Sequence, residues 1–223
     1  MDAFSLLVVV LLLLCACQTE SYESGDMVYS NLQADFAEAY SREAETLVSM
    51  MTDDGDSLTL LTDKTFKWAS TPDSTYRTLI YYNKVSAREG EVVSVRLVPT
   101  ATIVPAYTVK EMKTDPLTLA SSWKSRNGRY INLGVNILTG KIDGDDVVHK
   151  VGVVCDTLML SDDGGKHLHL RLFHDQGGAP EYYTSRNYLS IPLKRNPYHL
   201  GTGDTISVVV NTYEGPICRQ FVY

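Results

Sequence analysis

The chain beyond residue 30 alternates between short apolar runs and turn-forming residues, which is typical of β structure. Thr52-Asp53-Asp54-Gly55-Asp56 separates two such runs as a tight-turn cluster and predicts a hairpin. Pro99 and Pro105 flank another run and favour a sheet edge there. The expected strands of the first half, which are compatible with a small barrel, cover Leu47–Met51, Leu58–Leu61, Tyr76–Val85, Val92–Val98 and Ala101–Val104.

Two patterns leave alternatives open in this half. The apolar positions of residues 32–51 suit one face of a helix as well as alternate positions of a strand. The aspartates of residues 52–56 could hold calcium, but they lack the alternating ligands and distal Glu of an EF-hand loop. We therefore favour a turn at residues 52–56.

A polar stretch that ends at Pro116 marks a domain boundary, which divides the folded part into residues 29–112 and 113–223. Gly- and Asp-rich separators punctuate the second half, and no helical period intervenes. This spacing predicts an antiparallel β-sandwich, so the expected fold is all-β, with a small barrel followed by a sandwich. The expected strands are Tyr130–Leu138, Val147–Cys155, His167–Phe173, Tyr188–Ile191, Thr205–Thr212 and Ile217–Val222.

The N-terminus predicts export and lipidation. The apolar run Phe4–Ala16 is shorter than the roughly 20 residues that span a bilayer and fits a signal peptide, although Asp2 replaces the usual basic residue. Leu14-Cys15-Ala16-Cys17 is a bacterial lipobox, so residues 1–16 are expected to be cleaved and Cys17 to be lipidated, as by palmitate. Acyl chains contribute about 0.8 kcal/mol per buried methylene. Residues 17–28 then form a flexible tether.

These features place the protein in the cell envelope, on the outer membrane, with the leaflet left open. The expected partners are the membrane, through the lipid, and an envelope protein or a glycan. The 20 basic residues face 26 acidic ones once Asp2 is lost, which disfavours nucleic acid as a partner.

The cysteines of the mature chain, Cys155 and Cys218, both lie in apolar strand-like runs. In an oxidising compartment they could pair, and two buried free thiols are the favoured alternative. The sequence has no Cys-x-x-Cys, so a zinc ribbon or a thioredoxin motif has no support.

His167 and His169 fall on one face of an expected strand, where they could chelate zinc or copper with a third ligand from His149, His174 or a nearby Asp. Arg171 follows on the same face and would repel a cation, and polar residues are also what the wet face of a sheet requires. His174-Asp175 opens a Gly-rich turn, where we expect it to satisfy backbone groups.

Tyr182 and Tyr183 follow Pro180 in a polar loop and are expected to be partly exposed. Exposed aromatic rings can stack on sugars or anchor a protein interface, so both are candidate ligand-binding residues. The alternative is that one ring enters the core.

Catalytic motifs are missing from the sequence. It has no Gly-x-Ser-x-Gly elbow and no phosphate-binding Gly-rich loop before a helix, and its strand cysteines are in inert contexts. We therefore expect a non-enzymatic binding or accessory module that needs no cofactor.

The second half resembles the NigD-like C-terminal β-sandwich domain through Asp115-Pro116-Leu117, Gly128–Leu133, Leu170–Gly178 and Tyr188–Leu193. The first half, with residues 52–58 and Tyr81-Tyr82-Asn83, resembles the companion N-terminal OB domain.

The resemblance implies a lipoprotein of the Bacteroidales whose barrel begins with a strand at residues 32–40. OB folds often bind oligonucleotides or oligosaccharides, but a fold alone does not transfer that role. The founding member is linked to a bacteriocin operon, which gives immunity or self-protection as an alternative function.

Overall fold

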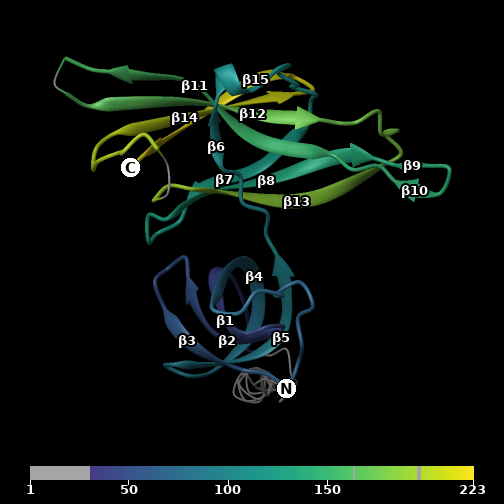
Figure 1. Cartoon of the computed structure of the whole chain (residues 1–223), viewed down its shortest axis with the longest axis vertical. Helices are drawn as coiled ribbons and strands as arrows, with labels where there is room; N and C mark the ends of the chain where they lie inside the picture. Colours follow the sequence, from purple (N-terminus) through teal and green to yellow (C-terminus); the bar gives the residue numbers. More distant parts are fainter. Residues whose placement is uncertain (1–30, 163, 195–196) are drawn as a thin grey trace, which may run out of the picture. The chain divides into compact units, whose positions relative to one another are not determined.

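A computed structural model describes residues 31–162, 164–194 and 197–223 (Figure 1). The predicted signal peptide, the lipidation site Cys17 and the tether lie outside these residues. Apart from one 3₁₀ turn, the regular structure of the described residues consists of strands. The all-β prediction is therefore confirmed.

The first five strands close into a barrel in the order β1-β2-β3-β5-β4. This is the strand order of an OB fold, with the β3–β5 pair parallel. Residues 32–51 form a strand, a turn and a second strand, so the strand interpretation is confirmed and the helical one is wrong. The strands are β1 (Leu32–Glu43), β2 (Thr46–Thr52), β3 (Ser57–Leu61), β4 (Ser74–Ser86) and β5 (Glu89–Leu97).

Alternation along the strands fills the barrel interior. Ala37 and Ala39 of β1 are fully buried, and their small side chains leave room for the ring of Tyr82, which is 1% exposed. A Cβ on Gly90 would lie 2.8 Å from that ring, so the close approach of β5 requires glycine. The Tyr82 hydroxyl donates to Asp35 at 2.8 Å, and burial, together with this contact, raises the pKa of Tyr82.

The β2–β3 connection is the turn that the sequence predicts. The Gly55 amide donates to the Thr52 carbonyl at 3.0 Å, and Gly55 has a positive φ of 99°. The Asp53 carboxylate points away from the turn and accepts two hydrogen bonds from Arg77, each at 2.6 Å.

The remaining strands form two sheets and a two-stranded hairpin. One sheet has the order β15-β14-β12-β11-β6 and the other β13-β8-β7 (Figure 1). The elements are β6 (Ile103–Pro105), the 3₁₀ turn η1 (Ala106–Thr108), β7 (Thr118–Lys124), β8 (Tyr130–Thr139), β9 (Lys141–Ile142), β10 (Asp145–Asp146), β11 (Lys150–Leu160), β12 (Lys166–Asp175), β13 (Tyr183–Pro192), β14 (Thr205–Thr212) and β15 (Gly215–Val222).

The sandwich departs from the antiparallel prediction at two strand pairs. β12 pairs with β14, and β11 with β6, in parallel. The reason is connectivity: the chain leaves β12 for β13 in the other sheet and returns to β14, which then runs beside β12 in the same direction. The sheets enclose a core to which both contribute, including Leu133, Ile191, Leu170 and Val208.

Strand β6 ends at Pro105 and lies at a sheet edge, as Pro99 and Pro105 predict. Because β6 pairs with β11 of the sandwich, the chain has already left the barrel by Ile103. This is earlier than the boundary expected after residue 112. Strand β7 was not predicted, because Thr118–Lys124 mixes serines and threonine with its apolar residues.

A β-bulge in β11 sets which of its side chains face the core. The register with β12 shifts between Cys155 and Thr157. Before the bulge, Val153 and Cys155 are buried; after it, Leu158 packs against the core instead. A one-residue insertion exchanges the two faces of a strand.

The two cysteines are free thiols. Cys155 is buried and Cys218 is exposed, so the expected burial holds for Cys155 only. Strands β12 and β14 separate β11 from β15. Three strand spacings amount to about 14 Å, far beyond the reach of a disulfide.

Residues Gln33–Tyr223 cluster as one compact unit, in which a buried polar network joins barrel and sandwich strands. Arg77, 5% exposed, donates to Asp53, to Asn132 Oδ1 at 2.9 Å and to Ser190 Oγ at 3.0 Å. Its guanidinium also lies 4.0 Å from the ring centroid of Tyr130. Because each buried partner is satisfied by another, breaking the Arg77–Asp53 pair would leave an uncompensated charge.

Candidate functional site

A hollow of about 640 Å³ lies along β8 and β13 of the three-stranded sheet. The β10–β11 connection and the end of β5 complete its wall. The volume falls in the range of about 300–1,000 Å³ that is usual for ligand sites.

The wall combines apolar, aromatic and polar groups. Buried Val135, Ile137 and Leu189 contribute apolar surface, and Tyr183 and Tyr188 contribute rings. The polar groups belong to Arg96, Thr139, Asp146, His149, Ser185 and Asn187. Such a mixture suits a ligand that has both apolar faces and hydrogen-bonding groups.

A chain of hydrogen bonds runs from the hollow into the protein. Thr139 Oγ1 lies 3.0 Å from His149 Nε2, and His149 Nδ1 lies 3.0 Å from His174 Nε2. His174 Nδ1 lies 2.9 Å from the carbonyl oxygen of Asp115. The two imidazole planes differ by only 12°, with centroids 5.3 Å apart, so the rings meet nearly edge to edge.

The carbonyl at the inner end fixes the direction of every bond in the chain for neutral rings. A carbonyl only accepts, so His174 Nδ1 donates to Asp115 and His174 Nε2 must accept. His149 Nδ1 is then the donor to His174, which leaves His149 Nε2 as the acceptor. The Thr139 hydroxyl therefore donates to His149.

Burial sets the electrostatics of this chain. It lowers the pKa of His149 below the ordinary 6.5, and the neighbouring His174 lowers it further, while Asp115 and Asp175 act in the opposite direction. His149 is therefore a neutral base near pH 7. His174 is 1% exposed, so the inner ring is closed off from solvent.

The strand register brings the two histidines together. Val151 pairs with His174 across β11 and β12, and His149 lies two residues before Val151 on the same face. The bulge in β11 puts odd-numbered residues of its first half on the core side, so His149 turns towards His174. The sequence points to both residues as possible third metal ligands and to His174 as a turn residue, and it does not pair them.

The predicted metal ligands His167 and His169 lie at the other end of β12, on the opposite face from His174. Their rings stack with centroids 3.9 Å apart, and His167 Nε2 lies 2.6 Å from Ser207 Oγ. Burial, and then the neighbouring His169, lower the pKa of His167. The expected third ligand from His149 or His174 is therefore wrong.

Among the described residues, His, Cys, Asp and Glu form no group of three or more that could hold a metal ion. Arg171, on the same face, binds Asp156 through two contacts of 3.0 and 2.7 Å. Metal binding by the histidine pair stays a prediction.

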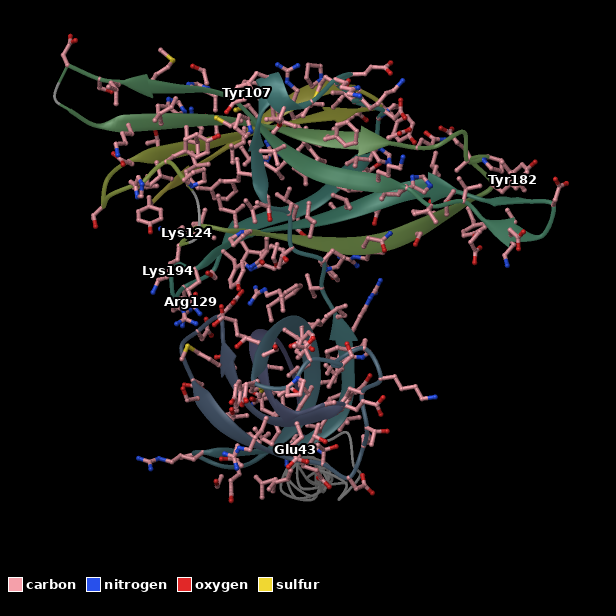
Figure 2. All side chains as sticks on the ribbon, viewed as in Figure 1. Glu43, Tyr107, Lys124, Arg129, Tyr182 and Lys194 are labelled. Carbon is pink, nitrogen blue, oxygen red and sulfur yellow. The ribbon has the colours of Figure 1, made fainter. Side chains whose placement is uncertain are left out.

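The predicted exposure of the two tyrosines is confirmed, with Tyr182 79% and Tyr183 48% exposed. Tyr183 begins β13 and lines the hollow. Tyr182 lies beside the β9–β10 hairpin (Figure 2), where a Cβ on Gly140 would come within 2.8 Å of its ring. Ligand binding by either residue stays a prediction.

The turn role expected of His174-Asp175 holds for Asp175, whose carboxylate accepts a hydrogen bond from the Gly177 amide at 3.0 Å. His174 instead takes part in the chain described above. The sequence signal that could have revealed this is the register of the β11–β12 hairpin, which the bulge conceals.

Comparison with known proteins places residues 99–222 in the NigD-like C-terminal beta sandwich domain. No curated protein matches the sequence. Among solved structures, a NigD-like immunity protein from Bacteroides caccae is 21% identical with a TM-score of 0.64, and the match covers 86% of this chain and 96% of that one.

Two further structures share the fold. A proposed toxin-related protein from Parabacteroides distasonis has 19% identity and a TM-score of 0.62, covering 86% of this chain and 93% of that one. A proposed lipoprotein from Bacteroides fragilis has 13% identity and a TM-score of 0.57, covering 86% and 96%.

Helices able to cross a bilayer are not found among the described residues. The barrel order, the two-sheet sandwich and the match over residues 99–222 agree with one another. The chain therefore belongs to the NigD-like family.

Proposed function

We propose that this protein is a lipid-anchored module of the cell envelope, on the outer membrane, that binds a glycan in the hollow along β8 and β13. The observation that carries the proposal is the wall of that hollow. It sets tyrosine rings and buried apolar side chains beside several hydrogen-bonding groups.

The two tyrosines support different parts of a sugar-binding role. Tyr188 is held by edge-on contacts with Phe36 and Trp123, at centroid distances of 5.1 and 6.5 Å, so it is a fixed wall. Tyr183 is about half exposed and presents a ring that a sugar could cover. Asn187 and Asp146 add groups that can hydrogen-bond to hydroxyls.

Charge favours a neutral polyol over a polyanion. The processed chain has 20 basic and 26 acidic residues, and in the wall of the hollow the charges of Arg96 and Asp146 offset each other. A nucleic acid would be repelled by the net negative charge of the protein, whereas a neutral glycan would bind without this electrostatic cost.

A glycan array probed with the purified protein tests the proposal. Tyr183→Ala should lower the affinity for the captured glycan at least about tenfold, since aromatic anchors dominate the binding energy of such sites. Tyr107→Ala is the matched control, because Tyr107 is 88% exposed in η1 and lies outside the hollow (Figure 2). The proposal would be contradicted if the wild-type protein captured no glycan, or if both variants lost affinity equally.

The lipid anchor rests on the lipobox at Leu14–Cys17. Cells fed an alkyne analogue of palmitate should label the wild-type protein and leave Cys17→Ser unlabelled. A labelled Cys17→Ser protein, or an unlabelled wild type, would show that the anchor is not at this cysteine.

Self-protection against a bacteriocin is a second prediction, made from the family resemblance. The structure from Bacteroides caccae is described as an immunity protein, and its 21% identity supports the shared fold alone. A deletion strain challenged with culture supernatant of its parent should become sensitive if the role is real. Unchanged growth would reject it.

A further inference from the structure

We propose that Thr139, His149 and His174 form a nucleophilic relay that cleaves acyl esters bound in the hollow. This activity goes beyond glycan binding and does not depend on it. Three parts of the structure support it: the direction of the hydrogen bonds, their position in the hollow and the fixed inner end.

The arrangement has the three parts of an activated nucleophile. A hydroxyl lies within hydrogen-bonding distance of a neutral base, and a third group orients that base. Thr139 Oγ1 to His149 Nε2 is 3.0 Å, and His149 Nδ1 to His174 Nε2 is also 3.0 Å. Only one direction of donation satisfies the Asp115 carbonyl, so the hydroxyl proton already points at the base.

His174 acts as the positioning residue. It is 1% exposed, and its Nδ1 is held by the Asp115 carbonyl at 2.9 Å. Its backbone also pairs with residues 113–115, because the His174 amide donates to the Lys113 carbonyl and its carbonyl accepts from the Asp115 amide, each at 3.0 Å. The second imidazole is thus fixed before any substrate binds.

The outer end of the relay is accessible. Thr139 and His149 both line the hollow, and both are half-buried. Burial from one side and access from the other are what a nucleophile and its base require.

The chemical steps balance with water as co-reactant. Thr139 Oγ1 attacks the ester carbonyl carbon as its proton passes to His149 Nε2. The carbon–oxygen bond of the ester then breaks, and the leaving alkoxide takes that proton. Water next gives a proton to His149 Nε2 and attacks the acyl-threonine, which releases the acid and returns the proton to Thr139.

Esters are the substrate class because an alkoxide leaves with help from a single proton donor, which the relay supplies. An amine is a poorer leaving group. Threonine can serve as the nucleophile in place of serine when a base is held at its hydroxyl.

A second hydroxyl–imidazole contact in the same molecule provides an internal control. Ser207 Oγ lies 2.6 Å from His167 Nε2, but Ser207 is only 2% exposed. Among the described residues, none forms a hydrogen bond with Nδ1 of His167. This pair lacks both the orienting group and the access.

The test measures hydrolysis of 4-nitrophenyl acetate by the full chain. Thr139→Val keeps the shape and the β-branch and removes only the hydroxyl, so it should fold as the wild type. It should lower the rate above background at least about 100-fold, while Thr139→Ser retains activity. Ser207→Ala should leave the rate unchanged.

Two further readouts separate catalysis from a structural role. The wild-type rate should rise with pH as His149 loses its proton, and the midpoint of this rise should lie below the ordinary histidine pKa of 6.5. A fluorophosphonate probe should add once to the wild type by intact mass, at Thr139, and leave Thr139→Val unmodified. Thermal melting confirms that each variant is folded.

The proposal is overturned if Thr139→Val hydrolyses the ester at the wild-type rate, or if the wild type neither hydrolyses nor takes up the probe. A fall of equal size in Ser207→Ala would also overturn it. Glycan capture by Thr139→Val reports on the proposed binding function separately.

Discussion

Strand β12 contributes to a histidine pair near each end, and the two pairs meet in different ways. At its start, the rings of His167 and His169 stack face to face with centroids 3.9 Å apart. At its end, His174 meets His149 edge to edge, with nitrogens 3.0 Å apart and planes within 12°. The same side chain is a stacking surface in one pair and a hydrogen-bonding group in the other.

The difference follows from how the members of each pair are connected. Residues two apart on one strand lie side by side on the same sheet face, so their rings approach through their faces. Diagonal neighbours on paired strands approach from opposite sides, which allows their edges to meet. Only edge contact links the ring nitrogens into a chain, and that chain is what gives the second pair its chemistry.

The largest difference should appear in stability. His174→Ala removes a fully buried ring and leaves the Asp115 carbonyl and His149 Nδ1 without their partner, so it should cost about 3 kcal/mol. His169→Ala on the half-buried face should cost about 1 kcal/mol. Urea unfolding measures both values. Equal losses would mean that the edge-to-edge pair is no more tightly built than the stacked one.

The pH dependence of stability should reveal both pairs. His149 and His167 have folded-state pKa values below the ordinary 6.5, so the unfolded chain binds protons first as the pH falls. The free energy of unfolding should decrease from about pH 6.5 downward and level off below the folded-state pKa values. At higher pH both states are neutral, and the contribution is constant.

Urea midpoints at a series of pH values would check this. His149→Gln and His167→Gln should each flatten the slope, and the double variant should flatten it further. A slope unchanged in the double variant would show that neither histidine titrates differently in the folded chain.

Added zinc should have a small effect on the stacked pair. Stacked rings direct their nitrogens away from a shared point, and His167 Nε2 is already bonded to Ser207. We expect saturating zinc to raise the thermal midpoint by less than about 2 °C. A larger rise that disappears in His167→Gln would establish the metal site that the sequence predicts.

The smallest signal is spectroscopic and requires no substitution. The hydrogen-bond chain predicts that neutral His149 and His174 both carry their proton on Nδ1. Two-bond ¹⁵N–¹H correlation spectra distinguish this tautomer from the commoner Nε2–H form. A proton on Nε2 of His174 would remove the donor to Asp115 and with it the direction of the whole relay.

Much of the fold could be predicted from the sequence because strand formation is encoded locally. The expected run Thr205–Thr212 coincides with β14, and residues 52–56 form the turn that their Asp and Gly content predicts. The resemblance to the NigD-like family favoured a strand at residues 32–40, within the stretch where the helical and strand periods overlap, and β1 covers these residues. Strand β7 was not predicted because its polar residues interrupt the alternation of apolar and polar positions.

The sequence by itself determined the all-β class, the positions of most strands and the exposure of Tyr182 and Tyr183. Tertiary structure alone decided the candidate site, because Thr139, His149 and His174 come from three separate segments. Their meeting depends on the bulge between Cys155 and Thr157, which exchanges the two faces of β11 and so turns His149 towards His174. The apolar pattern fixes which residues form a strand, but an inserted residue changes the face that each side chain occupies.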